Sequence, residues 1–153
     1  MTLPADLNRD LAPIRVLLEE TTTMVLGTRM PDGTPRATPV FFATDDGLRP
    51  IFLSDPASVH SRNLAASPQA SAAMYPEEGD WRKLRGVQMT GLARALDGSE
   101  AEAARRTYAR RFPFVAELAS SMAASRMYAF TPSWVRLIDN RRGFGFQQEW
   151  SLA

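Results

Sequence analysis

Three short runs of apolar and β-branched residues, with polar residues interspersed, occupy the first third of the chain. Their patterns predict strands over residues 23–29, 36–44 and 49–54. The turn sequences Pro31-Asp32-Gly33 and Asp45-Asp46-Gly47 separate these strands. Because tight turns join antiparallel neighbours, the three strands are expected to form an antiparallel meander.

A helical spacing of apolar residues precedes the meander. Ile14, Leu17 and Leu18 recur on one face of a helix, which predicts an N-terminal helix over about residues 10–20. Asp10 is the expected cap of this helix, with Pro13 in its opening turn.

The rest of the chain continues the mixture of strands and helices. Ser99 and Glu102 have the spacing of a capping box before a helical stretch. The patterns predict helices over 56–66, 101–111 and 113–123, and strands over 69–75, 86–96, 127–130 and 134–138.

Strands outnumber helices, so the expected fold is mainly β with flanking helices (α+β). An antiparallel barrel with helices packed outside it closes such a sheet most naturally. The chain has 153 residues, which is the size of one domain. We therefore expect a single domain over residues 1–153, with the barrel core over about 21–150.

Composition narrows the function classes. The chain has 18 basic and 17 acidic residues, and a net charge of +1 attracts neither nucleic acid nor an anionic membrane. No window approaches the roughly 20 apolar residues of a membrane span, and no basic leader precedes an apolar run at the start. We therefore expect a soluble, cytoplasmic protein with no nucleic-acid or membrane partner.

Common catalytic motifs are nearly absent. His60 is the only histidine and there is no cysteine, so neither a multi-histidine nor a thiolate metal centre can form. The sequence has no Gly-x-Ser-x-Gly elbow and no phosphate-binding Gly-x-x-x-x-Gly-Lys-Ser/Thr loop. We therefore predict no metal site and assign no catalytic side chain.

The segment around His60 is the most informative. An apolar strand ends at Ser54 and a helix is expected from Pro56, and the free N–H groups at a helix start suit a phosphate. Ser54 and Ser58 offer hydroxyl groups, while His60 and Arg62 offer positive charge. In the alternative interpretation, Ser54 or Asp55 caps the helix and the basic residues lie on its surface.

Three segments resemble the pyridoxamine 5'-phosphate oxidase superfamily. The flavin-phosphate segment of that family, an apolar strand ending in Ser or Thr followed by Ser, a basic residue and Asn-Leu, is similar to residues 51–64. Its hairpin motif is similar to Asp32-Gly33-Thr-Pro-Arg36-Ala-Thr38-Pro39-Val40, and its strand ending in Gly-x-Ala/Val is similar to residues 84–93. The resemblance runs from about Thr21 to Trp150 and implies an antiparallel FMN-binding split β-barrel.

A narrower resemblance is to a small bacterial branch of uncharacterised proteins. It rests on Arg85-Gly86-Val87-Gln88, Tyr108-Ala-Arg110-Arg111-Phe112-Pro113, Asp139-Asn140 and Gly143-Phe144-Gly145. That branch carries histidine where the oxidases have lysine, as His60 does here. The oxidases proper have a C-terminal Arg-Leu-x-Pro element, whereas this chain ends Phe146-Gln-Gln-Glu-Trp-Ser-Leu-Ala. Oxidation of pyridoxamine phosphate is therefore not expected.

The resemblance implies a homodimer with an FMN site at the subunit interface. The residues that would hold the flavin phosphate are Ser54, Ser58, Val59, His60 and Arg62. Those that would contact the ring system are Thr38, Pro39 and Val40 beside it, Gln88 at its pyrimidine end, and Asn140 and Phe144 from the second subunit. The three tryptophans are expected in the core or an interface, with Trp134 as the candidate to stack on the flavin.

Two functions remain open. The first is a flavin-dependent oxidoreductase acting on a small molecule, in which the redox chemistry belongs to the cofactor. The alternative is a non-catalytic carrier or sensor of flavin, deazaflavin or heme on the same fold.

Overall fold

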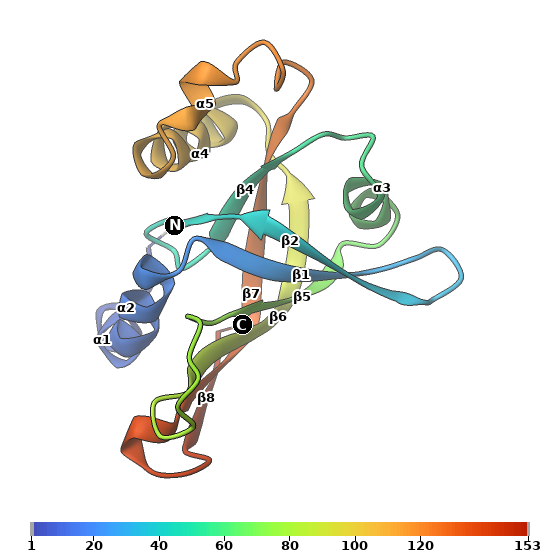
Figure 1. The fold of residues 1–153 in the computed structure, drawn as a ribbon. Helices are drawn as coiled ribbons and strands as arrows, with labels where there is room; N and C mark the ends of the chain where they lie inside the picture. The colour runs from blue at the N-terminus through green and yellow to red at the C-terminus, as the bar shows by residue number, and fades with distance from the viewer. Residues whose placement is uncertain (1, 153) are drawn as a thin grey trace.

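The computed structural model describes residues 2–152 as one eight-stranded antiparallel sheet with helices around it (Figure 1). The strands are β1 (Thr23–Arg29), β2 (Pro35–Phe41), β3 (Ala43–Thr44), β4 (Pro50–Ser54), β5 (Gln69–Met74), β6 (Arg85–Ala95), β7 (Arg126–Asp139) and β8 (Gln147–Ser151). The helices are α1 (Ala5–Asp10), α2 (Ala12–Glu20), α3 (Val59–Ala66), α4 (Gly98–Arg111) and α5 (Phe114–Glu117), with a short 3-10 helix, η1 (Asn140–Arg142).

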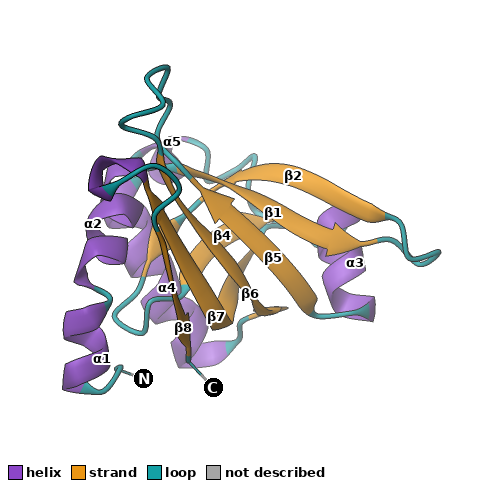
Figure 2. Ribbon diagram, turned by 90° about the horizontal axis from the view of Figure 1, so that it is seen from below, coloured by secondary structure: helices purple, strands orange, loops and turns teal. Residues whose placement is uncertain are grey.

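The sheet curls into a half-barrel, as the split-barrel prediction required. Its strand order is β2-β1-β5-β6-β7-β4-β3, and β8 adds to β7. Phe42, Phe52 and Phe130 are fully buried in its core. Helices α1 and α2 lie at one side of the sheet and α3 at the opposite side (Figure 2).

A bulge in the longest strand pair bends the sheet. The register of β6 against β7 shifts between Thr90 and Gly91, where two strands of 11 and 14 residues run together. A Cβ atom at Gly91 would overlap the carbonyl oxygen of Thr131 and lie 2.8 Å from Pro132 Cα. Glycine is therefore required by the close approach of the two backbones, and the bulge increases the local twist.

The chain crosses from one end of the sheet to the other at Phe42. β2 pairs with β1, whereas β3 pairs Ala43 with Ile51 of β4. The predicted strand over 36–44 is thus two strands. Both predicted hairpins form, since β1 pairs with β2 and β3 pairs with β4, but they lie at opposite ends of the strand order and do not make one continuous meander. Phe42 lies between β2 and β3, and its side chain is fully buried in the core where the two ends of the sheet meet. Its burial explains why the predicted strand divides at this residue.

The N-terminal region contains two helices instead of one. The apolar stripe of α2 is confirmed, because Ile14, Leu17 and Leu18 are its buried residues. The predicted cap Asp10 is wrong: it is the last residue of α1, and Leu11 stands at the start of α2. A helix beginning right after Pro4 places Asp10 inside a helical turn, where it has no free N–H group to cap.

Two helix predictions in the second half need correction. The capping box of Ser99 and Glu102 does not form, since α4 begins at Gly98 with Asp97 before it. Asp97 makes no capping bond either, because its carboxylate pairs with Arg126 at 2.5 Å. The predicted helix over 113–123 shrinks to α5, and turns follow it.

The strands at the C-terminal end are longer than predicted. Residues 127–130 and 134–138 belong to the single strand β7, because the bulge opposite Gly91 lets pairing continue through Pro132. β8 was not predicted. Four of its five residues are exposed and only Trp150 is half-buried, so the segment lacks the apolar alternation of a core strand.

Among residues 2–152, no helix has both the length and the apolar character that crossing a bilayer requires.

Candidate ligand-binding site

Ser54, Ser58 and His60 meet where β4 ends and α3 begins. Ser54 Oγ lies 2.8 Å from His60 Nε2, and Ser58 Oγ lies 3.4 Å from the same nitrogen. Ser58 is also the N-cap of α3, where its hydroxyl oxygen accepts from the Ser61 N–H at 3.3 Å. The cap is therefore Ser58 rather than the predicted Ser54 or Asp55, and the helix begins at Val59, three residues after the predicted start at Pro56.

Burial sets the electrostatics of His60 in this cluster. Burial lowers the pKa of His60, so the imidazole tends to be neutral in the protein alone. A bound anion would favour the protonated imidazolium instead. The imidazole can thus share a hydrogen bond with Ser54 in the free protein and carry positive charge next to a phosphate.

Backbone donors complete the arrangement. Within residues 2–152, the amide N–H groups of Val59 and His60 make no hydrogen bond, as expected for the first turn of a helix. The Asp55 carboxylate accepts from the Ala57 N–H at 2.8 Å, so it caps the turn before the helix. Two hydroxyls, two free amides and an imidazole therefore converge on the N-terminal end of α3.

Asn63 anchors α3 to the barrel. Its side chain is buried, with Nδ2 donating to Thr28 Oγ1 at 3.1 Å and to Met30 Sδ at 3.3 Å. This positioning role was missed by sequence reasoning. The Asn-Leu pair of the resemblance was the only signal, and it did not identify the partners Thr28 on β1 and Met30 just after it.

Arg62 does not join the cluster. The Arg62 side chain is exposed and makes no polar contact within residues 2–152. The Val59 side chain, beside the cluster, is 38% exposed. A role for Arg62 in ligand binding stays a prediction.

β2 places Thr38, Pro39 and Val40 at a free strand edge. β2 is the end of the sheet path, so one of its edges pairs with β1 and the other has no strand partner. Thr38 and Val40 are half-buried and Pro39 is exposed on the other face. β2 also contacts β4, whose last residue is Ser54.

Gln88 is not brought to the His60 cluster. It is exposed on β6, where its Oε1 accepts from Arg136 Nη1 at 3.5 Å. Strand register puts Gln88 and Pro39 in one row across the sheet, with Val25 and Ala73 between them. Three strand spacings separate them, about 14 Å, so the two side chains lie on one face without meeting.

Asn140 and Phe144 lie in an arm that projects from the far end of the barrel. We define the arm as residues 75–84 and 140–146, at the bottom of Figure 1, away from α3. Asn140 Nδ2 donates to the Trp81 carbonyl at 2.8 Å, and Asn140 Oδ1 accepts from the Gly145 N–H at 3.0 Å. Within one chain, these residues cannot reach the His60 cluster.

The arm exposes aromatic rings on a fixed frame. Phe144 is 83% exposed and packs edge-on against Trp81, which is 55% exposed, with centroids 5.6 Å apart. The guanidinium of Arg82 lies 4.8 Å from the Trp81 ring centroid. Trp81 was expected in the core or an interface, and its exposure excludes the core. Trp134, the predicted stacking residue, donates from Nε1 to Glu149 on β8 at 3.1 Å, and its stacking on a flavin stays a prediction.

Comparison with known proteins identifies the family. A family model described as "Pyridoxamine 5'-phosphate oxidase" matches residues 12–139. The chain belongs to the pyridoxamine 5'-phosphate oxidase-like split-barrel family. This confirms the resemblance and the fold inferred from residues 51–64 and the two other segments.

The names of the curated relatives of this chain do not state an activity. The UPF0306 protein YhbP of Salmonella schwarzengrund is 30% identical over 98 residues, which is 64% of this chain and 63% of the relative. A UPF0306 protein of Enterobacter sp. is 26% identical over 113 residues, 74% of this chain and 76% of the relative. The first match thus spans less than two thirds of the relative's own length.

Solved structures with a similar fold have names that mention different ligands. A heme binding protein from Mycobacterium smegmatis has a TM-score of 0.76 and 26% identity, covering 90% of this chain and 55% of that chain. The heme storage protein HutZ from Vibrio cholerae has a TM-score of 0.69 and 18% identity, covering 92% and 94%. A pyridoxamine 5'-phosphate oxidase-related, FMN binding protein from Nostoc punctiforme has a TM-score of 0.62 and 15% identity, covering 95% and 91%. The last two likenesses show the fold alone.

Proposed function

We propose that this chain binds FMN between two subunits of a homodimer and acts as a flavin-dependent oxidoreductase on a small molecule. The observation that carries this proposal is the His60 cluster at the start of α3. Ser54 and Ser58 offer hydroxyls at 2.8 and 3.4 Å from the imidazole. These groups, with two free amides, have the chemistry that a phosphate monoester requires.

The residues present therefore fit the phosphate end of FMN. Ser54, Ser58 and His60 would hydrogen-bond the phosphate, together with the amides of Val59 and His60. The free edge of β2 would lie beside the ring system, where Thr38 and Val40 offer backbone groups. Pro39 has no N–H group to donate, so it can contact the ring only through its carbonyl and its apolar surface.

A second subunit would supply the rest of the site. The arm carries Phe144 and Trp81 into solvent, and exposed aromatic pairs of this kind mark binding surfaces. Because the arm cannot reach the His60 cluster of its own chain, Asn140 and Phe144 would act on the partner's site. The exposed aromatic pair, and its distance from the His60 cluster of its own chain, support a homodimer.

The protein's own part in the chemistry would be binding, orientation and exclusion of water. FMN supplies hydride and electron transfer when it is bound. His60 is the only neutral base in the cluster, and Ser54 fixes the position of its Nε2 atom. No carboxylate is bonded to His60 within residues 2–152, so the cluster does not have the arrangement of a hydrolytic triad.

A non-catalytic carrier is the second candidate. The specific observation in its favour is the likeness to the heme binding protein from Mycobacterium smegmatis, at 26% identity and a TM-score of 0.76. His60 would be the strongest axial ligand that this chain offers to heme, because it is the only histidine. Coordination through Nε2 would break the Ser54 hydrogen bond, which counts against heme in this chain.

Spectroscopy distinguishes these candidates. Purified protein is incubated with FMN, riboflavin or hemin, separated from free ligand, and its absorption spectrum recorded. Retained flavin bands support the proposal, whereas a Soret band with no flavin retention supports the heme carrier.

Turnover is tested on the loaded protein. The flavin-loaded protein is mixed with NADH or NADPH without oxygen, and then exposed to air. Bleaching followed by return of the yellow colour, in proportion to bound flavin, supports an oxidoreductase. Flavin that is tightly bound yet resists every nicotinamide and small reductant, while free flavin responds, rejects the enzyme and leaves a binding protein.

A further inference from the structure

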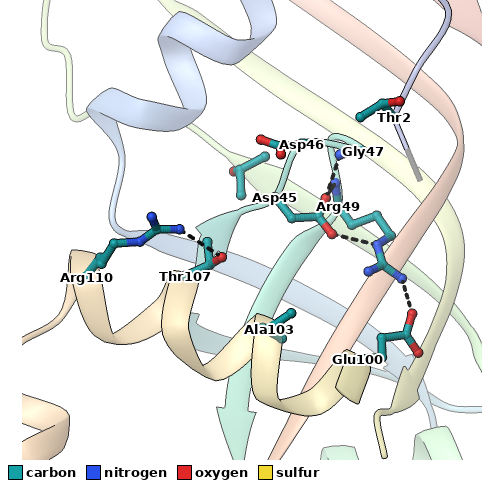
Figure 3. A pocket seen from close by; sticks show the side chains of 11 residues that line it. Thr2, Asp45, Asp46, Gly47, Arg49, Glu100, Ala103, Thr107 and Arg110 are labelled. Atoms are coloured by element: carbon teal, nitrogen blue, oxygen red, sulfur yellow. Dashed lines mark hydrogen bonds and ion pairs between the residues drawn. The ribbon is translucent and has the colours of Figure 1, made fainter. Parts of the chain in front are cut away.

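A polar cleft separates the β3–β4 turn from α4, and none of the predicted flavin residues lines it. It has two adjoining parts of about 410 and 360 Å³. Both parts are bounded by Thr44, Asp45, Asp46, Thr107 and Arg110. Figure 3 shows the larger part, with the turn forming one wall and α4 the other.

One end of the cleft is held together by paired charges. Asp45 accepts from the backbone N–H groups of Gly47 and Arg49, both at 2.9 Å, and pairs with the Arg49 side chain at 2.8 Å. Arg49 also pairs with Glu100 of α4 at 3.1 Å. These bonds fix the distance between the turn and the helix, so the cleft is preformed.

Two charges in the lining have no partner of opposite sign within residues 2–152. The Asp46 carboxylate makes no hydrogen bond or ion pair within residues 2–152; only its backbone carbonyl accepts a bond, from Arg15. Among the described residues, the Arg110 side chain bonds only to the Thr107 hydroxyl, at 3.4 Å. The two side chains belong to opposite walls, one to the turn and one to the helix (Figure 3).

A third observation concerns Thr44, which lines both parts of the cleft. Thr44 Oγ1 is buried and has no hydrogen-bond partner within residues 2–152. Unsatisfied buried hydroxyls are rare in folded proteins and each calls for an explanation. The preformed end, the unpaired charges and the unsatisfied hydroxyl all occur in one cleft.

The charges of the lining indicate the class of ligand. The two parts are lined by four arginines and four carboxylates: Arg15, Arg49, Arg110, Arg111, Glu19, Asp45, Asp46 and Glu100. A balanced lining does not favour a phosphate or another net anion. It does favour a neutral molecule that carries one charge of each sign.

We propose that this cleft is a binding site for a small zwitterion, whose carboxylate pairs with Arg110 and whose ammonium group pairs with Asp46. The volume suits a molecule of amino-acid size. The site is independent of the proposed flavin site, because the two share no residue.

Calorimetric titration with a series of zwitterions of increasing length tests the proposal. The probes are glycine, γ-aminobutyrate and ε-aminocaproate, with butyrate and butylamine as singly charged controls at the same ionic strength. We expect one zwitterion to bind at millimolar or lower concentration, and the singly charged controls to bind at least about tenfold more weakly. Absence of binding by all three zwitterions, or equal binding of butyrate or butylamine, would overturn the proposal.

Variants of the two unpaired charges identify the site. Asp46→Asn and Arg110→Gln should each weaken binding of the preferred zwitterion about tenfold or more. Glu102→Gln and Arg105→Gln are matched controls, since both residues are exposed on α4 and neither lines the cleft. Equal weakening by the control variants would reject the cleft as the site. The flavin affinity of all four variants should be unchanged, so either result here is independent of the flavin assignment.

Discussion

Ser54 and His60 share a 2.8 Å hydrogen bond between Oγ and Nε2, across the junction of a buried strand and a short helix. The bond joins a side chain that is 7% exposed to the only histidine of the chain. It shows that the strand end and the helix start form one polar unit. It also gives His60 a defined orientation in which an arriving phosphate would meet both groups.

Replacement of His60 by alanine should weaken FMN binding more than riboflavin binding. The reason is that only FMN has the phosphate that the imidazole would contact. A lost charge-assisted hydrogen bond costs roughly 1.5–3 kcal/mol, or about ten- to a hundredfold in affinity. Fluorescence titration of both ligands measures the difference. Val59→Ala is the control in the same helical turn, because it keeps the amide N–H that would contact the phosphate and changes only the side chain. Equal weakening for FMN and riboflavin would show that His60 is structural.

Protonation of His60 should make the free protein less stable as the pH falls. Burial places the folded-state pKa of His60 below that of an exposed histidine, about 6.5. Between the two values the unfolded chain binds a proton that the folded chain does not, so the free energy of unfolding rises with pH across this window. The contribution of the neutral imidazole is present above about pH 6.5 and is lost as the pH falls through the folded-state pKa.

Urea unfolding of wild type and His60→Gln at several pH values between about 5 and 7 measures this effect. The variant should show a flatter dependence of unfolding free energy on pH than the wild type. Carboxylates such as Asp139 and Glu100, whose pKa values are lowered by arginine hydrogen bonds, titrate at lower pH and are common to both proteins. An identical slope in both proteins would mean that His60 is solvated rather than buried.

Replacement of Gly91 by alanine should destabilise the fold by about 1–3 kcal/mol, as overpacking of a close contact does. The added Cβ would overlap the Thr131 carbonyl oxygen, a backbone atom that cannot turn aside. Gly79→Ala is the matched control, because its Cβ would meet nothing within 4 Å, and we expect it to change stability by less than about 0.5 kcal/mol. Similar midpoints of urea unfolding for the two variants would show that the bulge can relax.

Local sequence patterns predicted most of the elements but not how the strands pair. β1 has the predicted bounds of 23–29, since apolar alternation and a clear turn define it. The break at Phe42 was not predictable, because an apolar residue in an apolar run gives no local sign that the chain changes partners there. β8 was missed for the opposite reason: it is a mostly exposed strand held by pairing with β7.

The residues of the candidate site also divide into those with a local sequence signature and those without one. Ser54, Ser58 and His60 were predicted because a strand end and a helix start leave a local signature, and the fold brings them into contact. The anchoring of Asn63 on Thr28 joins residues 35 positions apart, a relation that no local pattern records. The contribution of Asn140 and Phe144 to the site depends on a second subunit, and that contribution stays a prediction.

Complementation between two defective chains tests that prediction. If the arm acts in trans, Asn140→Ala with Phe144→Ala should weaken FMN binding while the sedimentation coefficient remains that of a dimer. His60→Ala disables the other half of each site. When the two variants are mixed and allowed to exchange subunits, about half of the dimers are mixed and each contains one intact site, so about a quarter of the wild-type FMN sites should reappear. Recovery of none would mean that both halves of the site lie in one chain. A monomer with wild-type FMN affinity would remove the partner from the site altogether, and the exposed ring of Phe144 would then need another ligand.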